Sequence, residues 1–185
     1  MVDWDKRYRN GFYRCEAEPH GLLQEFWRLI PGKKVIDIAM GTGRDGKFLA
    51  KKGFCVYGLE RSTEAVLIAK KASETTGCSM SIVQGDAVAM PFKNNSADCV
   101  LVFYFLQRDI MRNMADILKK GGILIYETFL KRQNMVDRPR NPEYLLEDGE
   151  LIAFFRDFDL LFYEETISGL SGKRRAAAKF IGRKR

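Results

Sequence analysis

The chain has 185 residues, of which 46% are hydrophobic and 30% charged, and its formal net charge is +7. This composition is typical of a globular protein with a packed core, and it excludes an intrinsically disordered chain. No window approaches the roughly 18 consecutive apolar residues of a membrane-spanning helix, and the N-terminal "MVDWDKRYRN" lacks the apolar core of a signal peptide. We therefore expect one cytoplasmic domain over residues 1–185, with no membrane partner, in which residues 1–30 form an N-terminal arm and helix.

Apolar residues recur with helix and strand periodicity in alternation along the chain. The first expected elements are a helix over 22–30, a strand over 33–39, a helix ending near 52, a strand over 54–59, a helix over 63–76 with Ser62 as its N-cap, and a strand over 80–84. They are followed by a strand over 98–103, a helix over 107–119 ended by Gly121 and Gly122, a strand over 123–129, a helix ending near 156, and strands over 158–166 and 174–181.

Strands that alternate with helices in this way predict a mainly parallel sheet with helices on both faces. The last two strands are separated by only about seven residues, which is too few for a parallel crossover, so we expect them to pair antiparallel. The predicted fold class is α/β, a Rossmann-like three-layer sandwich with a seven-stranded, mainly parallel sheet and a C-terminal antiparallel hairpin. In such a sheet the ligand lies at the carboxyl ends of the strands.

A glycine motif follows the first predicted strand in "VIDIAMGTGRDGKF", residues 35–48. Gly41, Gly43 and Gly46 fit G-x-G-x-x-G, the spacing that lets backbone approach a nucleotide closely. Asp37 stands four residues before the first glycine, where it would repel a pyrophosphate. The α-ammonium and sulfonium of S-adenosylmethionine (SAM) suit a carboxylate at this place, so the motif favours SAM over a dinucleotide.

Two more acids follow the next strands. Glu60 ends the second strand, where a carboxylate can accept hydrogen bonds from both ribose hydroxyls. Asp86, in "QGDAVAMPF" after the third strand, is placed to accept a hydrogen bond from the adenine amino group. Three acids at the ends of successive strands therefore predict an adenosine ligand beside the glycine motif.

At this point the sequence resembles a known family. The stretches "VIDIAMGTGRDGKFLAKKGFCVYGLERS", "GDAVAMPF", "ADCVLVFYFL" and "LKKGGILIYETF" are similar to successive motifs of the class I SAM-dependent methyltransferases. The stretches "WDKRY", "YETF" and "PEYLLEDGELIAFF" further resemble the tellurite-resistance-type methyltransferases. The resemblance implies transfer of a methyl group from SAM, with S-adenosylhomocysteine as product, to a small-molecule acceptor such as a thiol or metalloid compound.

The resemblance also implies a set of cofactor residues. Those implied for the methionine moiety are Asp37, Ala39, Met40, Gly41, Thr42 and Gly43. Those implied for the ribose, the adenine and the sulfonium end are Glu60, Arg61, Asp86, Ala87, Phe103 and Tyr104. Ala39 stands where the family usually has a glycine, and alanine can keep the turn if its φ stays negative. Met40 stands where the family has a small residue, and its larger side chain would narrow the methionine pocket.

The acceptor side is less defined by the sequence. Methyl transfer from a sulfonium depends mainly on positioning, and the Asn/Asp-Pro-Pro-Tyr/Phe signature of amino-methylating enzymes is absent after the fourth strand. His20 and Tyr104 are the candidates for a catalytic role. Residues that we expect near the acceptor are Trp4, Tyr8, His20, Phe105, Arg108 and Thr128, with Trp4 and Tyr8 on one helical face of a lid.

Three alternatives remain open at this point. The last 13 residues, "KRRAAAKFIGRKR", hold seven of the 31 basic residues and no acid, so the remainder carries 24 of each sign. We expect this segment to be a solvated tail. The alternative is that it serves as a docking patch, which would suit methylation of RNA or a ribosomal component. A non-catalytic SAM-binding protein is suggested by Ala39 and Met40, whereas an NAD oxidoreductase is disfavoured by Asp37. The four cysteines lack zinc-ligand spacing, so we expect no metal, and we expect a monomer or homodimer.

Overall fold

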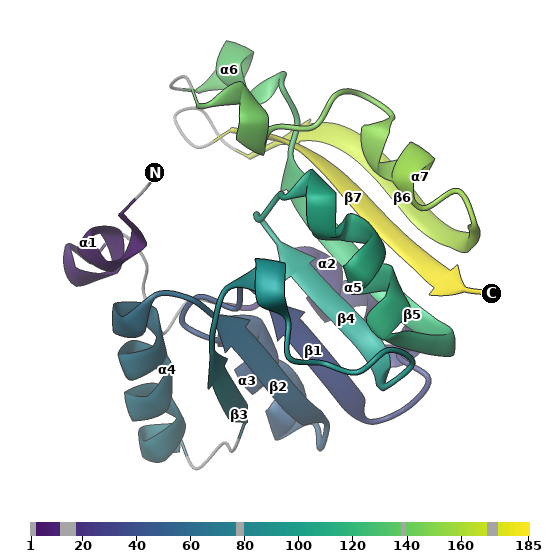
Figure 1. The fold of residues 1–185 in the computed structure, drawn as a ribbon. Helices are drawn as coiled ribbons and strands as arrows, with labels where there is room; N and C mark the ends of the chain where they lie inside the picture. Colours follow the sequence, from purple (N-terminus) through teal and green to yellow (C-terminus); the bar gives the residue numbers. More distant parts are fainter. Residues whose placement is uncertain (1–2, 12–17, 77–79, 138–139, 170–173) are drawn as a thin grey trace.

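Seven strands form one sheet in the order β3-β2-β1-β4-β5-β7-β6 (Figure 1). This computed structural model describes residues 3–11, 18–76, 80–137, 140–169 and 174–185. The strands are β1 (Lys34–Ile38), β2 (Cys55–Glu60), β3 (Ser81–Gln84), β4 (Ala97–Phe103), β5 (Leu118–Phe129), β6 (Phe158–Ser168) and β7 (Arg175–Lys184). Strands β1 to β5 pair in parallel, and β7 runs antiparallel between β5 and β6. The predicted α/β fold class with its antiparallel hairpin is therefore confirmed.

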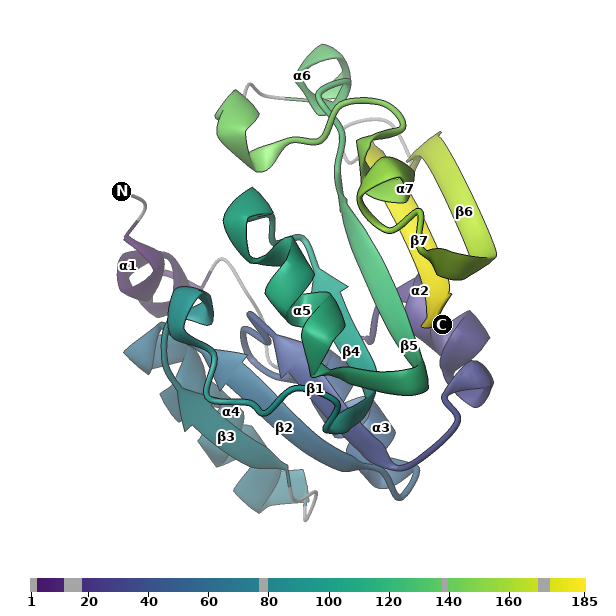
Figure 2. The ribbon, with the colours of Figure 1, turned by 45° about the vertical axis from the view of Figure 1, so that its right-hand side comes forward.

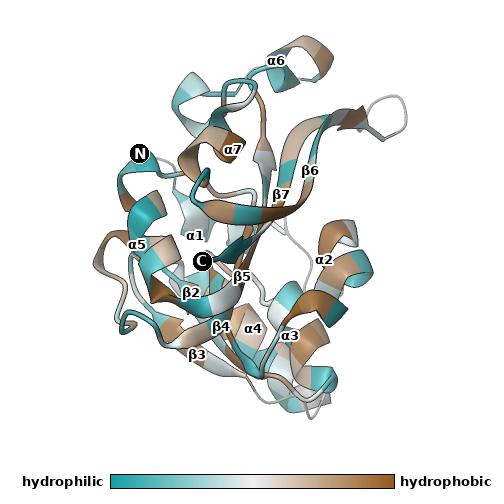
Figure 3. Ribbon diagram, turned by 90° about the vertical axis from the view of Figure 1, so that its right-hand side faces the viewer, coloured by the Kyte–Doolittle hydropathy of each residue, from teal (hydrophilic) through white to brown (hydrophobic). Residues whose placement is uncertain are grey.

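Helices cover both faces of this sheet, with α2 and α3 on one face and α5 on the other (Figures 1 and 3). The α-helices are α1 (Trp4–Arg9), α2 (Gly21–Phe26), α3 (Arg44–Lys51), α4 (Thr63–Thr76), α5 (Met111–Ile117), α6 (Gln133–Val136) and α7 (Glu150–Phe154). Short 3₁₀ turns are η1 (Trp27–Leu29), η2 (Ala87–Ala89), η3 (Arg108–Ile110) and η4 (Pro142–Tyr144). Within the described ranges, no helix has the length and apolar character needed to cross a bilayer.

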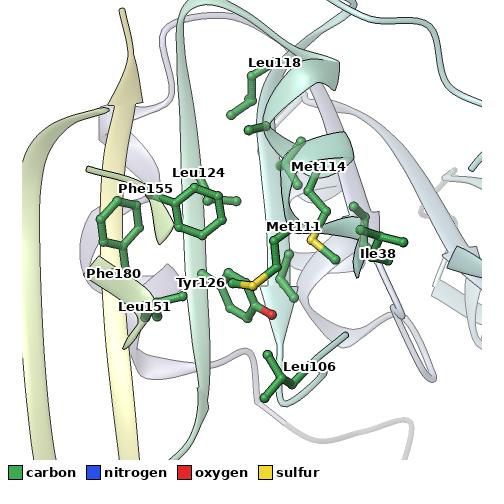
Figure 4. Close-up of a cluster of buried hydrophobic side chains, with 14 of the residues drawn as sticks. Ile38, Leu106, Met111, Met114, Leu118, Leu124, Tyr126, Leu151, Phe155 and Phe180 are labelled. Carbon is green, nitrogen blue, oxygen red and sulfur yellow. The ribbon is translucent and has the colours of Figure 1, made fainter. Parts of the chain in front are cut away.

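The core on the α5 face gathers large side chains from β5, α5, α7 and β7 (Figure 4). Tyr126 of β5 is fully buried there, and its hydroxyl donates to the carbonyl oxygen of Phe105 at 2.9 Å. Because the buried hydroxyl has an acceptor, the ring packs without an unsatisfied polar group. This bond ties the segment after β4 to β5, at the end of the sheet where the ligand is expected.

One helix ends earlier than the sequence predicts. The spacing predicts a helix up to Lys119, but α5 ends at Ile117, and β5 starts at Leu118 and runs through Gly121 and Gly122. The pairing with β4 shifts between Ala97 and Cys99, and Gly121 adopts a φ of +79°. The two glycines therefore accommodate an irregularity inside β5, and they do not end the helix.

The basic C-terminal segment is part of the sheet, so the prediction of a solvated tail is wrong. Residues 175–184 form β7, whose neighbours on its two sides are β5 and β6. Lys179 pairs with Glu164 at 2.6 Å, Arg185 pairs with Asp159 at 2.7 Å, and the Lys184 ammonium donates to the carbonyl of Leu118 at 2.7 Å. These three cations therefore have partners within the fold.

Candidate functional site

The carboxyl ends of β1, β2 and β4 meet around residues 39–43, which we call the glycine loop. Ala39, Gly41 and Gly43 have φ angles of +55°, +58° and +73°. The peptide N–H of Met40 donates to Leu59 at 3.0 Å, and that of Gly43 donates to Met40 at 3.0 Å, after which α3 begins. The loop thus presents backbone, with little side-chain bulk, at the end of the sheet.

Two residues of this loop differ from the sequence prediction. The sequence predicts that Ala39 keeps the turn with a negative φ, but its φ is positive. This left-handed conformation costs an L-residue about 1 kcal/mol. Met40 is buried against Val66 and Ala69 of α4, and its sulfur fills the space that a side chain on Gly58 would occupy. The Met40 side chain therefore extends over the middle of β2, into the core, which argues against its narrowing the methionine pocket.

Replacing Ala39 by glycine is expected to stabilise the protein by about 1 kcal/mol, because glycine adopts positive φ without the steric cost. The corresponding rise in melting temperature is about 2–4 °C for a chain of this size. Thermal unfolding of the two proteins measures the difference. Ala72→Gly, in the interior of α4, is the matched control and should destabilise by about 1 kcal/mol. A lower melting temperature for Ala39→Gly would mean that the strain is absent.

Asp37 lies at the end of β1 with its side chain almost fully buried, at 3% exposure. The peptide N–H of Gly46 donates to its carboxylate, but the buried Oδ2 has no hydrogen-bond partner among the described residues. Burial, reinforced by the charges of Asp45 and Glu60, raises the pKa of Asp37 well above its usual range. A buried carboxylate with an orphaned oxygen calls for a cation or proton donor, which fits the ammonium of SAM, bound directly or through one water.

Glu60, at the end of β2, is joined to the glycine loop. One of its carboxylate oxygens accepts from the peptide N–H of Gly41 at 2.9 Å, and the other accepts from that of Ser62 at 2.8 Å. Burial raises its pKa, and these backbone donors partly oppose the shift. The carboxylate is therefore held at the place where the sequence predicts the ribose.

The predicted adenine residues lie further along the same end of the sheet. Asp86 caps η2 by accepting from the peptide N–H of Val88 at 3.0 Å, and it forms an ion pair with Arg61 at 3.5 Å. Both side chains are about half exposed, whereas Ala87 is buried. The pair is thus open to a ligand that follows Glu60.

Helix α1 contacts α4 (Figures 1 and 2), and its Tyr8 side chain reaches the glycine loop at Gly41. Asp5 accepts from the Ser62 hydroxyl at 2.5 Å, and Arg9 pairs with Glu64 at 2.8 Å. A Cβ atom added to Gly41, whose φ is +58°, would lie only 2.8 Å from the Tyr8 hydroxyl, so a larger residue there would be strained and would displace Tyr8. Trp4 is half-buried, with the Arg7 guanidinium 5.2 Å from its ring centroid. Helix α1 therefore lies against the glycine loop through Tyr8.

On the other side of the loop, the end of β4 meets the segment before α2. The His20 ring stacks on Phe103, with centroids 4.1 Å apart. Asp45 holds this histidine twice, accepting from its peptide N–H at 2.8 Å and bonding its Nδ1 at 2.8 Å, while Arg44 contacts Nε2. Sequence reasoning missed Asp45 because nothing in the sequence places residues 20 and 45 together.

A cavity of about 610 Å³ opens beside this histidine on the α2 face. Of the predicted acceptor residues, only His20 lines the cavity. Tyr104, the other candidate for a catalytic role, lines it as well. Glu127 and Arg175 also line it and were missed. Glu127 lies near the end of a strand, as Asp37 and Glu60 do, so the signal that found those two acids could have found it.

Three other predicted acceptor residues have structural surroundings. The Arg108 guanidinium binds Glu150 and the carbonyls of Glu143 and Leu145. Thr128 is buried, on the face of β5 opposite to Glu127. Phe105 packs against the core on the α5 face. The structure does not bring these side chains to the cavity.

Comparisons with known proteins give a consistent result. Residues 35–122 match a family model described as a methyltransferase domain. The chain is 30% identical over 129 residues to a demethylmenaquinone methyltransferase of Renibacterium salmoninarum, covering 67% of this chain and 53% of that protein. It is 24% identical over 157 residues to a probable SAM-dependent methyltransferase, TehB, of Haemophilus influenzae, covering 82% of this chain and 54% of that protein. The chain thus spans about half the length of these curated relatives.

The same similarity appears among solved structures. The crystal structure of TehB from Haemophilus influenzae matches with a TM-score of 0.79 and 22% identity, over 98% of this chain and 67% of that one. At this identity the match establishes the fold alone.

Proposed function

We propose that this chain transfers a methyl group from SAM to a small-molecule acceptor, on the premise that residues 35–122 match a methyltransferase domain and that the chain resembles the class I SAM-dependent methyltransferases. The observation that carries the proposal is the buried, orphaned carboxylate oxygen of Asp37 behind a left-handed glycine loop. SAM supplies an electrophilic methyl group when bound. The chain's own residues bind and orient it, and α1 acts as a lid that excludes water.

Each part of the cofactor has a residue that suits it. Asp37 and the glycine loop would hold the methionine moiety, Glu60 the ribose, and Asp86 with Ala87 the adenine. Phe103 and Tyr104 would line the sulfonium end. The acceptor would be a thiol or metalloid compound, and the name of the relative from Renibacterium salmoninarum adds a quinol to the acceptors that deserve testing.

Release of S-adenosylhomocysteine tests the proposed activity. Purified protein with SAM is offered thiols, selenite, a quinol and RNA, each at low and high salt. Turnover with a small molecule but not with RNA is the expected outcome, because Lys179 of β7 and Arg185 after it are paired with acids of the fold. SAM binding by calorimetry without turnover on any acceptor would favour a non-catalytic SAM-binding protein.

SAM binding is expected to release protons and to strengthen as the pH rises through the raised pKa of Asp37. Burial and nearby acids raise the pKa of Asp37, so the ligand-free protein holds a proton there more tightly than an unfolded chain does. The stability contributed by that proton is complete below the usual aspartate pKa, near 4, and is lost as the pH rises through the raised pKa. The SAM ammonium favours the ionised carboxylate and expels the proton. Calorimetry in two buffers of different ionisation enthalpy counts the protons, and uptake in place of release would contradict the assignment.

A further inference from the structure

The cavity on the α2 face adjoins the proposed sulfonium end of the cofactor site. Arg44, which lines it, directly follows Gly43 of the glycine loop, and Tyr104 directly follows β4. His20, on the same wall, stacks on Phe103. A molecule in this cavity therefore lies next to the residues proposed to surround the reactive methyl group.

Glu127 is the buried carboxylate of this cavity, with 7% of its surface exposed. The Tyr104 hydroxyl donates a short hydrogen bond to its Oε1. Lys179 lies opposite Glu127 in the strand pairing, but the Lys179 ammonium is paired with Glu164. Within the described ranges, Glu127 makes no ion pair, so it is a buried carboxylate available to a proton donor.

Tyr104 holds this arrangement in an unusual backbone conformation. Its φ is +53°, which is rare for an aromatic residue and recurs at functional sites. Its peptide N–H donates to the carbonyl of Glu127 at 2.7 Å, and its ring lies 4.5 Å from that of Phe129. The strand-end tyrosine is thereby fixed against the carboxylate.

Arg175, at the start of β7, approaches the same tyrosine from the other side. Its Nη1 donates to the Tyr104 oxygen at 3.3 Å, and its guanidinium lies 5.1 Å from the ring centroid. In the described part of the chain it has no carboxylate partner. The cavity thus offers the Glu127 carboxylate and the Arg175 guanidinium, which both contact the neutral Tyr104 hydroxyl and do not pair with each other.

We propose that this cavity binds the methyl acceptor, and that the acceptor is a small acid whose nucleophilic atom carries a proton. The inference rests on the proposed function. Arg175 binds the acidic group, and the proton-bearing end faces Glu127. For a thiol, sulfur forms a bond to the methyl carbon, the bond from that carbon to the sulfonium breaks with its electron pair remaining on the cofactor sulfur, and the thiol proton passes to Glu127. Glu127 is then a catalytic residue.

A matched set of acceptors tests the inference. 3-Mercaptopropionate, 3-aminopropionate and 3-hydroxypropionate share the acidic group and differ in the nucleophile, whereas 2-mercaptoethanol keeps the thiol and lacks the acid. At least one of the three acids is expected to be methylated with a kcat/KM roughly tenfold or more above that of 2-mercaptoethanol, since a guanidinium–carboxylate contact is worth about that factor. Methylation of none of the acids, or preference for 2-mercaptoethanol or selenite, overturns the inference.

Variants separate the two proposed roles. Glu127→Gln keeps the acceptor for the Tyr104 hydroxyl but cannot take a proton, so kcat should fall by about 100-fold or more while the Kd for SAM stays unchanged. Arg175→Met should raise KM for the acid and leave 2-mercaptoethanol unaffected. Glu74→Gln, on the exposed face of α4, is the control and should change neither constant. Undiminished turnover in Glu127→Gln overturns the role of Glu127. Calorimetry and the turnover assay together separate failure of this inference from failure of the proposed function. If SAM binds and only other acceptors are methylated, the inference fails and the proposed function stands.

Discussion

Replacing Asp37 by asparagine is expected to lower the affinity for SAM about 100-fold while leaving the ligand-free protein at least as stable as before. The two effects have opposite signs because the same burial causes both. In the free protein the carboxylate is desolvated and its Oδ2 has no described partner, so its charge costs free energy. Asparagine keeps an oxygen for the Gly46 N–H and removes that charge. With SAM present, it also removes the charge that the ammonium requires.

Calorimetry gives the affinity of the Asp37 variant, and thermal unfolding with and without SAM gives its stability. Asp98→Asn is the control, because Asp98 stands at the opposite end of the sheet, where it pairs with Lys119 and accepts from the Lys34 N–H. Although burial opposes ionisation there, these partners hold the pKa of Asp98 below its usual range. That variant should lose stability and keep SAM binding. If Asp37→Asn lost stability and kept full affinity, Asp37 would have a purely structural role.

The parts of the site that the sequence predicts are those set by local pattern. Asp37 and Glu60 are readable because strand periodicity places each at a carboxyl end, and the order of parallel strands brings those ends together. The conformation of Ala39 and the direction of Met40 are not readable, because Met40 packs over Gly58 on the neighbouring strand. The same holds for contacts across long separations, such as those between His20 and Asp45.

The sequence predicts the final strand over residues 174–181, but the charge of the segment suggests a solvated tail instead. The final residues contain the apolar stretches "AAA" and "FIG" among their cations, and their burial between β5 and β6 decides their structure. Pairing partners determine such a segment more strongly than its own charge does, because long cationic side chains reach past the strand to acids and carbonyls. The end of α5 was misplaced for a related reason: Leu118 pairs with Ala97 and so begins β5.

Arg108→Met is expected to destabilise the protein by about 2 kcal/mol, because the guanidinium joins η3 to the first residue of α7 and to the segment before it. Its Nε and Nη2 donate to the Glu150 carboxylate at 2.5 and 2.8 Å, and its remaining donors reach the carbonyls of Glu143 and Leu145 at 3.0 and 2.9 Å. Methionine retains the aliphatic stem but leaves Glu150, only 17% exposed, without its cation. The melting temperature should fall by about 4–8 °C.

Arg112→Met is the matched control for the Arg108 substitution. Arg112 also pairs with an acid, Asp157 at 2.7 Å, but both side chains are more than half exposed, at 62% and 56%. An exposed pair contributes at most about 1 kcal/mol, so the control should shift the melting temperature much less. Hydrogen exchange should accelerate over residues 143–150 in the Arg108 variant alone. Equal losses of stability in the two variants would mean that the Arg108–Glu150 contact contributes no more than an ordinary surface ion pair. A larger loss in the Arg108 variant would show that Arg108 stabilises the packing of α7 against β7 and does not serve the acceptor site.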